Sequence, residues 1–294
     1  MVIGIPRPPQ LIPIIPKYIL CGESPWSRAG SSFCRVLEAY GPHGVSKAIL
    51  RASVRELYDP LYGHTIPYVS VYDILDVVTP REALWRVVAG PRNRLHYTLL
   101  DLLQLLEARG VNVENVGVTG SLAAGIENLE ISDIDLVVYG VEASESMYKL
   151  FVEEIGLRGP PIPSFGGLRV EPGVGIGWRR GLFKGLIVGW VGLPGVGELC
   201  EPLREYFKVR APAKPVSLTL EIPKGQLQAL TYPPCVRSRD GVYIVSFEYN
   251  VGALLYRGGE LRVEGLASWD GGVVYIATRE KPGLVRSSEP HLNI

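Results

Sequence analysis

Two aspartates, Asp133 and Asp135, lie two residues apart in a segment that has the composition of a β-strand. The apolar residues Ile134, Leu136 and Val138 alternate along it, which is typical of a strand. Side chains at positions i and i+2 of a strand point to the same face, about 6.5–7 Å apart. Two carboxylates this close repel each other unless a cation lies between them. The spacing therefore predicts an oxygen-liganded divalent cation, Mg²⁺ or Mn²⁺, held by the two aspartates.

A Gly-Ser turn, Gly120 and Ser121, precedes the aspartates. Residues 116–118 predict a short strand before this turn, and residues 122–126 predict a short helix after it. A turn that opens a helix presents free backbone N–H groups and the positive end of the helix dipole, and both favour phosphate. Glycine lets the backbone approach a ligand closely, and the serine hydroxyl adds a hydrogen bond. A phosphate-binding turn followed by paired aspartates on the next strand indicates metal-assisted phosphoryl chemistry.

The pattern resembles the signature of the nucleotidyltransferases of the DNA polymerase β superfamily, and most closely that of a group of uncharacterised archaeal predicted nucleotidyltransferases. The signature is an apolar residue, Gly, Gly or Ser, a spacer, and then Asp-apolar-Asp/Glu-apolar. The matching residues are Gly120, Ser121, Asp133, Ile134, Asp135 and Leu136. Thr119 departs from it, because it stands where the family has an apolar residue. The resemblance covers mainly residues 115–140.

The resemblance implies a reaction in which a nucleoside monophosphate passes from an NTP to an acceptor hydroxyl and pyrophosphate is released. In that scheme Asp133 and Asp135 hold Mg²⁺, and Gly120 and Ser121 hold the β- and γ-phosphates. The resemblance identifies neither the acceptor nor the preferred base, because this scaffold serves several acceptor classes.

A third carboxylate is the missing part of this pattern. Active members of the resembled superfamily usually place one on a later strand, where it completes the metal site and acts as general base. The apolar run at residues 185–191 is the natural position for that strand, and it contains no Asp or Glu. Glu171 and Glu221 are the candidates to replace it from a neighbouring element. Two hypotheses follow: an enzyme with a displaced base, or a catalytically inactive protein that binds nucleotide or RNA.

Three basic residues, Arg179, Arg180 and Lys184, form a turn just before the apolar run. We expect them to contact phosphate outside the motif, because a guanidinium fork matches phosphate oxygens. The alternative is that they are ordinary solvated charges of a turn.

The elements around the motif predict an α+β domain over residues 79–204, with a nucleotidyltransferase-like mixed sheet and flanking helices. Thr79-Pro80-Arg81-Glu82 predicts a helix start with a capping box. Residues 93–109 predict a longer helix with a stripe of leucines, which ends at Gly110.

A proline-rich region over residues 1–78 precedes this domain, and a segment of different character, residues 205–294, follows it. The C-terminal segment predicts a small β-barrel or sandwich. Its expected strands are residues 218–222, 242–247, 253–256, 261–265 and 273–278. Such a module binds RNA or another single-stranded nucleic acid by stacking bases on aromatic side chains, or else serves for packing or dimerisation. The aromatic candidates are Tyr243, Phe247, Tyr249 and Trp269.

Composition sets further limits. The formal net charge is zero, which argues against a strong electrostatic attachment to nucleic acid over the whole surface. No segment is long and apolar enough to span a bilayer, and the N-terminal region lacks the compact apolar stretch of a signal peptide. We therefore expect a cytoplasmic protein without a membrane partner. Low Asn, Gln, Met and Cys content together with 24 prolines indicates a thermophilic source.

The four cysteines, Cys21, Cys34, Cys200 and Cys235, fit no zinc-binding spacing. The favoured interpretation is that they are small buried hydrophobic residues. A bridge between Cys21 and Cys34 is the alternative, in line with the disulfides of intracellular proteins from hyperthermophiles.

Overall fold

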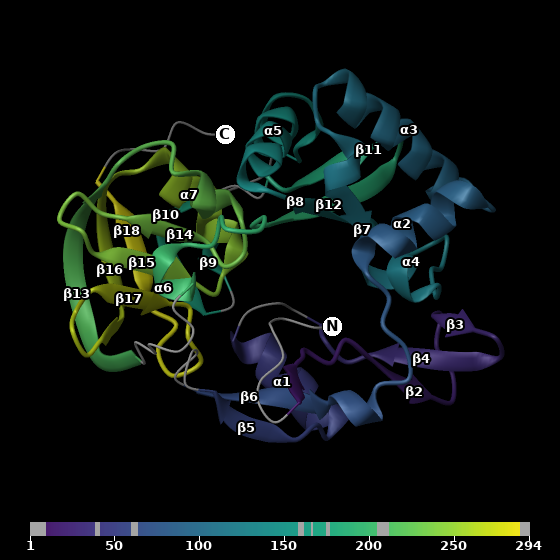
Figure 1. Cartoon of the computed structure of the whole chain (residues 1–294), viewed down its shortest axis with the longest axis horizontal. Helices are drawn as coiled ribbons and strands as arrows, with labels where there is room; N and C mark the ends of the chain where they lie inside the picture. The colour runs from purple at the N-terminus through teal and green to yellow at the C-terminus, as the bar shows by residue number, and fades with distance from the viewer. Residues whose placement is uncertain are drawn as a thin grey trace.

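The computed structural model of this protein describes residues 10–38, 42–59, 64–157, 162–165, 167–174, 177–204 and 212–288. It has a mixed α+β structure with several separate sheets, so the predicted α+β class is confirmed. Figure 1 shows three groups of elements: N-terminal strands with a helix at the bottom, a helix-covered sheet at the upper right and a large sheet at the left.

Four strands, in the order β11-β12-β8-β7, form the sheet that carries the Gly120-Ser121 turn and the aspartate pair. They are β7 (Val116–Val118), β8 (Ile134–Tyr139), β11 (Arg180–Phe183) and β12 (Leu186–Leu193). Strand β8 pairs parallel with β12 and antiparallel with β7, so the sheet is mixed. The parallel register sets Gly189 of β12 opposite Asp135 of β8. Strand β8, which begins within the aspartate motif, is therefore a central strand that is hydrogen-bonded to a neighbour on each side.

The helices associated with this sheet are α2 (Pro80–Ala89), α3 (Arg94–Ala108), α4 (Gly120–Ala124) and α5 (Val141–Leu150). The predicted capping box of α2 is confirmed: the Glu82 N–H donates to Thr79 Oγ1 at 3.2 Å, and the Thr79 N–H donates to Glu82 Oε2 at 2.8 Å. The predicted stripe of α3 is also confirmed. Its buried leucines are Leu95, Leu99, Leu102 and Leu106. Each buried leucine contributes about 1.5–3 kcal/mol, so packing holds α3 against the sheet.

Of the two predicted forms, a barrel or a sandwich, the barrel is wrong, because the C-terminal strands within the described ranges form one branched sheet of eight strands that does not close. Its strands are β9 (Ile162–Phe165), β10 (Leu168–Val174), β13 (Pro212–Ile222), β14 (Cys235–Arg237), β15 (Tyr243–Ser246), β16 (Gly259–Ser268), β17 (Val273–Ile276) and β18 (Leu284–Ser287). The long strand β16 causes the branching. It pairs with β13 and also with β17 and β18, which occupy successive parts of its length. Strands β9 and β10 precede residue 205 in the chain, yet they belong to this sheet.

One segment predicted as a strand is a helix. Residues 253–256 lie within α7 (Gly252–Arg257), whose residues Ala253, Leu254 and Leu255 are all fully buried. A short continuous apolar run gives the same pattern in a buried strand and in a buried helix, so periodicity cannot separate the two.

An aromatic cluster joins the two large sheets. The rings of Trp178 and Tyr249 lie 4.9 Å apart, and those of Trp178 and Trp190 lie 5.5 Å apart. The Tyr249 hydroxyl accepts a hydrogen bond from Gly192 N–H of β12 at 2.7 Å and donates one to the Leu230 carbonyl at 2.8 Å. Because Tyr249 follows β15 whereas Trp190 lies on β12, the cluster ties the motif-bearing sheet to the C-terminal sheet.

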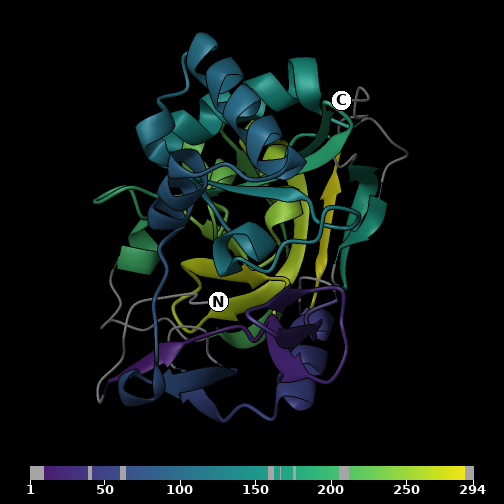
Figure 2. The same ribbon diagram turned by 90° about the vertical axis from the view of Figure 1, so that its right-hand side faces the viewer.

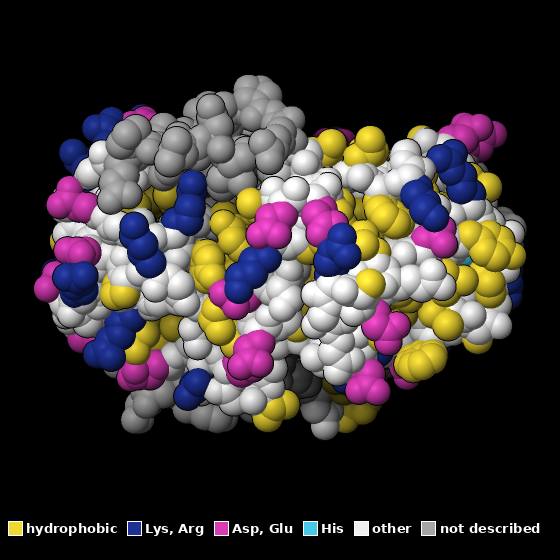
Figure 3. All heavy atoms as spheres, turned by 90° about the horizontal axis from the view of Figure 1, so that it is seen from above, with side chains coloured by type: hydrophobic (Ala, Val, Ile, Leu, Met, Phe, Trp, Pro, Cys, Tyr) yellow, Lys and Arg dark blue, Asp and Glu magenta, His cyan; other side chains and the backbone are white. Residues whose placement is uncertain are grey.

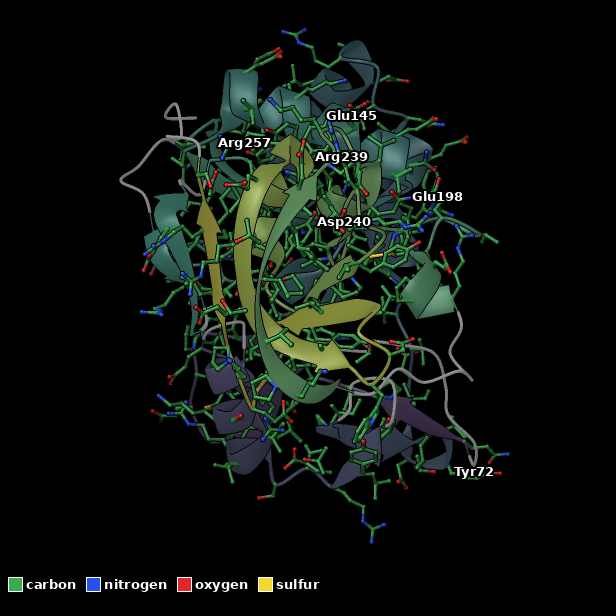
Figure 4. The ribbon with its side chains drawn as sticks, turned by 90° about the vertical axis from the view of Figure 1, so that its left-hand side faces the viewer. Tyr72, Glu145, Glu198, Arg239, Asp240 and Arg257 are labelled. Atoms are coloured by element: carbon green, nitrogen blue, oxygen red, sulfur yellow. A yellow bond between two sulfur atoms is a disulfide. The ribbon has the colours of Figure 1, made fainter. Side chains whose placement is uncertain are left out.

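Helices α5 and α7 meet at a second contact between these units. The Tyr256 hydroxyl of α7 donates a hydrogen bond to Glu145 of α5, and Lys149 pairs with the same carboxylate at 3.1 Å. Figure 4 labels Glu145 and Arg257 in the upper part of the molecule, where helices stand above the branched sheet. Burial and the nearby Glu145 raise the pKa of Tyr256 to about 12, in line with a hydroxyl that donates to a carboxylate.

The N-terminal region contains two small sheets and a helix, α1 (Pro42–Ala52). One sheet has the order β1-β6-β5 and the other β2-β4-β3. Their strands are β1 (Leu11–Pro13), β2 (Tyr18–Cys21), β3 (Ser27–Arg28), β4 (Ser31–Arg35), β5 (Glu56–Asp59) and β6 (His64–Ser70). Figures 1 and 2 both show the purple strands β3 and β4 below the teal helix α4. Arg279 connects the other small sheet to the C-terminal unit, because its guanidinium pairs with Glu56 at 2.7 Å.

The cysteines form two disulfides, Cys21–Cys34 and Cys200–Cys235, so the favoured interpretation of four unpaired buried residues is wrong. Cys21–Cys34 is the bridge that stood as the alternative, and it joins β2 to β4. Cys200 and Cys235 are 35 residues apart in sequence and meet through the packing of β14, so spacing gave no indication of their pairing.

None of the helices in the described ranges is long and apolar enough to cross a membrane.

Candidate functional site

Asp133 and Asp135 meet the Gly-Ser turn at one end of the four-stranded sheet. The Thr119 N–H, at the end of β7, donates to the Asp135 carbonyl at 2.8 Å and ties the turn to β8. Gly120 has a φ of +68°, in the left-handed region that favours glycine. A Cβ atom on Gly120 would clash with Asp135 Oδ2, so the turn and this carboxylate are packed against each other. The structure thus brings together Gly120, Asp133 and Asp135.

Cations surround the two carboxylates. Arg180 Nη2 of β11 lies 3.2 Å from Asp133 Oδ2, and Lys17 Nζ lies 3.6 Å from Asp135 Oδ2. Burial is the main cause that raises the pKa of Asp135, and the neighbouring Asp133 raises it further. The positive charges of Lys17, Arg180 and Arg35 act in the opposite direction. Asp135 is therefore a desolvated carboxylate that the neighbouring Asp133 repels, and the two side chains offer oxygen ligands that suit a divalent cation.

Asp135→Asn is expected to stabilise the metal-free protein at neutral pH. The folded-state pKa of Asp135 is raised, which means that the ionised carboxylate destabilises the folded protein. This cost is absent below the unfolded pKa of about 4, where the acid is protonated in both states, and it appears as pH rises through the folded pKa. Asparagine cannot ionise, so the variant does not bear this cost. Thermal unfolding in EDTA should give a melting temperature a few degrees above wild type at pH 7, with the difference vanishing at acid pH.

Asp101→Asn is the matched control for this substitution, because Asp101 pairs with Lys184 at 2.6 Å and is 41% exposed. It should not raise the melting temperature. A lower melting temperature for Asp135→Asn than for wild type at pH 7 would contradict the account of the paired carboxylates.

Ser121 lies in the turn but points into the protein. It is 5% exposed, and its hydroxyl hydrogen-bonds to Ser132 Oγ at 3.0 Å. Ser132 Oγ in turn accepts the Asn128 N–H at 2.9 Å. This chain of hydrogen bonds positions the loop that leads to Asp133. A phosphate contact at Ser121 would therefore use its backbone N–H, which belongs to the first turn of α4 and has no acceptor within the helix.

Gly120→Ala should damage the site without removing any ligand. A Cβ at a positive φ costs about 1–2 kcal/mol, and here it also displaces the Asp135 carboxylate. We expect the free energy of unfolding to fall by that amount and the affinity for Mg²⁺-nucleotide to fall about 10- to 100-fold, as when a supporting partner of a metal ligand is lost. Denaturant unfolding and calorimetric titration measure the two effects separately.

Gly125→Ala is the control for Gly120→Ala, because Gly125 has nearly the same φ of +65°. A Cβ there meets only the Arg28 side chain, at 3.8 Å or more. It should cost similar stability and leave nucleotide affinity unchanged. Equal losses of affinity in the two variants would contradict the proposed contact between Gly120 and Asp135.

A glycine, and no carboxylate, lies opposite Asp135 on the neighbouring strand β12. Gly189 faces Asp135 across β12 and β8, and a Cβ on Gly189 would lie 3.6 Å from Asp135 Oδ1. The two predicted substitutes lie in the branched sheet instead. Glu171 of β10 pairs with Arg286, and Glu221 of β13 pairs with Arg239 at 3.1 Å.

Neither Glu171 nor Glu221 is therefore brought to the aspartates. Within the described ranges, no three His, Cys, Asp or Glu side chains cluster as metal ligands would.

Of the three basic residues expected at phosphate, the structure brings only Arg180 to the aspartates. Arg179 hydrogen-bonds to Asn250 Oδ1 and lies over the Tyr249 ring, 5.4 Å from its centroid. Lys184 pairs with Asp101 of α3. Arg179 lies in the turn just before β11 and Arg180 is the first residue of that strand, so their side chains take different directions and only Arg180 reaches the aspartates.

Sequence analysis missed two cations, Lys17 and Arg35, which come from the N-terminal region. Lys17 directly precedes β2 and Arg35 is the last residue of β4, and both lie more than 90 residues before the aspartates in sequence. No local pattern marks them, since they reach Asp135 only through the docking of that sheet on the motif-bearing unit.

The site as a whole combines two carboxylates, a glycine turn and at least three nearby cations. It can hold a divalent cation through oxygen ligands and an anion through guanidinium and ammonium groups. In comparisons with known proteins, no family model, no curated protein and no solved structure matches this chain.

Proposed function

We propose that this protein is a metal-dependent nucleotidyltransferase that moves a nucleoside monophosphate from an NTP to an acceptor hydroxyl. One observation carries the proposal: Asp133 and Asp135 lie at the start of a central strand, packed against the glycine turn that ends the neighbouring strand. The motif spacing noted in the sequence supports the same reaction class.

The residues present fit a divalent metal at this site. The donors are carboxylate oxygens, and the raised pKa of Asp135 reflects desolvation first and repulsion by Asp133 second, both of which a bound cation would offset. When bound, Mg²⁺ or Mn²⁺ neutralises phosphate charge and polarises the transferred phosphoryl group. Asp133 and Asp135 would hold it, the Gly120 turn would orient the phosphates, and Arg180 would bind a phosphate oxygen.

The alternative is a catalytically inactive protein that binds nucleotide or RNA with the same residues. Gly189 favours it, because a glycine occupies the position from which a third carboxylate would reach Asp135. An enzyme of this architecture must obtain its general base elsewhere, for example from the acceptor or from water.

Nucleic-acid binding through the C-terminal sheet has limited support. Of the four aromatic residues expected to stack on bases, Trp269 is 84% exposed, whereas Tyr249 is buried and the Phe247 ring stacks on Tyr275. Figure 3 shows Lys and Arg side chains interspersed with Asp and Glu over the face seen there. A face of mixed sign does not concentrate the positive charge that nucleic-acid backbones attract.

Label transfer tests the proposed function. The protein is incubated with each α-labelled NTP, Mg²⁺ or Mn²⁺, and an acceptor pool of RNA, DNA or the chain itself. Metal-dependent label on an acceptor with an equal amount of pyrophosphate is the expected result. Metal-dependent nucleotide binding without label would favour the inactive binder, and no binding of any NTP would contradict both.

A further inference from the structure

The N-terminal region contributes a nearly buried lysine to the aspartate site. Lys17 is 11% exposed, and its Nζ lies 3.6 Å from Asp135 Oδ2. Its carbonyl accepts hydrogen bonds from the Val36 and Leu37 N–H groups, at 3.0 and 3.5 Å. The chain just beyond β4 therefore fixes the backbone from which this side chain extends. Holding a lysine in one place beside a carboxylate costs side-chain entropy, which its contacts at this position must offset.

The β2-β4-β3 sheet is docked on the helix and the loop that lie between the two motifs. Arg28 Nη1 of β3 donates to the Ala124 carbonyl at the end of α4, at 3.2 Å. Asn128, in the loop between the turn and the aspartates, donates through Nδ2 to the Pro25 carbonyl at 3.1 Å. These two contacts hold the sheet over the site and bring Lys17 to it.

The charges of the assembled site do not balance. Among the groups that act on the pair, Asp133 and Asp135 supply two negative charges, whereas Lys17, Arg35 and Arg180 supply three positive ones. Arg35 lies opposite Tyr18 in the pairing of β2 with β4, beside Lys17, and acts on Asp135 through its charge. These five groups together carry one net positive charge before any metal binds. A divalent metal held by the aspartates would raise the excess to three. The ligand that neutralises this excess must carry several negative charges close together.

We infer that Lys17, Arg35 and Arg180 form a cation set that binds the triphosphate of the substrate, and this inference rests on the proposed function of the same site. A triphosphate carries enough charge for the metal and the three cations together, whereas a single phosphate does not. Two of the three cations are guanidinium groups, which match phosphate oxygens, and the lysine adds a point charge.

This arrangement makes a distinctive prediction. A site with three carboxylates would repel a triphosphate in the absence of metal, whereas this one should bind it. Inorganic tripolyphosphate and ATP are therefore titrated calorimetrically into the full chain in EDTA and in Mg²⁺. Wild type should bind tripolyphosphate in both. Lys17→Met should weaken that binding about 10- to 100-fold in both, the loss expected for a charge-assisted hydrogen bond.

The controls separate charge from folding. Lys17→Arg keeps the charge and should retain most of the affinity. Lys47→Met removes an exposed lysine of α1, in the same region, and should change nothing. If Lys17→Met unfolds, as circular dichroism would show, Arg180→Gln serves in its place, because Arg180 lies at a half-exposed position on the sheet.

Two results would overturn the inference. In one, wild type fails to bind tripolyphosphate. In the other, Lys17→Met binds it as tightly as wild type or more tightly, which would make Lys17 a counter-ion for Asp135 and nothing more. The label-transfer assay distinguishes this failure from failure of the proposed function. If label transfer is unchanged in Lys17→Met, the proposed enzymatic function stands and the proposed cation set is wrong. If triphosphate binds but no label is transferred, the cation set stands and the proposed enzymatic function is wrong.

Discussion

Asp133→Asn and Asp135→Asn are each expected to abolish the metal-dependent part of nucleotide binding, with a loss of about 100-fold or more in affinity for Mg²⁺-NTP. The structure offers the metal only these two carboxylates among the described residues, because Gly189 stands where a third would reach the site. An amide keeps the shape of each side chain but removes its charge. The remaining ligand and one or two waters then hold Mg²⁺ too weakly for it to bridge to phosphate.

Calorimetric titration of each NTP, with Mg²⁺ and in EDTA, measures the effect on the two variants. Asp101→Asn is the matched control, since it removes a carboxylate that pairs with Lys184 outside the site. It should bind nucleotide as wild type does. The interpretation also requires that the fold survives, which the melting temperature of each variant reports. Metal-dependent binding that persists in a folded Asp135→Asn protein would contradict the assignment of the metal ligands.

Trp178→Ala is expected to lower the free energy of unfolding by about 3–5 kcal/mol, a large share of the stability of a typical domain. Trp178 is fully buried, its ring contacts Trp190, Tyr249 and Tyr148, and its Nε1–H donates to the Asn250 carbonyl at 3.1 Å. Alanine would leave a cavity at the junction of the two large sheets and a buried carbonyl without its donor. Guanidinium unfolding followed by circular dichroism measures the change in the free energy of unfolding.

Trp269→Ala is the control for this loss, because Trp269 is 84% exposed. It should change the free energy of unfolding by about 0.5 kcal/mol or less. Similar losses in the two variants would mean that the junction contributes little. A large loss for Trp178→Ala alone would show that the motif-bearing sheet and the C-terminal sheet are stabilised together.

Local signals in the sequence predicted the elements best. The capping box at Thr79 and the leucine stripe of α3 each depend on residues a few positions apart, and both are present. The prediction failed where the outcome depends on distant partners. Residues 253–256 form helix α7, and whether an apolar run becomes a buried helix or strand depends on what packs around it. The branching of the C-terminal sheet depends on β16 pairing with three strands, which no single segment encodes.

The residues of the candidate site likewise fall into those that local spacing marks and those that only tertiary contacts place. Gly120, Asp133 and Asp135 lie within 16 residues of sequence, so their spacing alone marks them as a possible site. Their role in binding metal and phosphate stays a prediction. Lys17 reaches the site through tertiary docking and gave no signal in the sequence. Glu171 and Glu221 are acidic residues that follow the motif in the chain, yet both lie on strands of the branched sheet and pair with arginines there, Arg286 of β18 and Arg239 of the turn after β14. Sequence order does not determine which sheet a later strand joins.

The most direct test of the central claim is to locate the metal. Crystals of the protein are grown with Mn²⁺ and a non-hydrolysable NTP, and an anomalous difference map is calculated above the manganese absorption edge. The account predicts one strong peak bridging the carboxylates of Asp133 and Asp135, with the triphosphate running past Gly120 toward Arg180 and Lys17. An ordered nucleotide elsewhere on the chain, with no anomalous peak at these two aspartates, would contradict it.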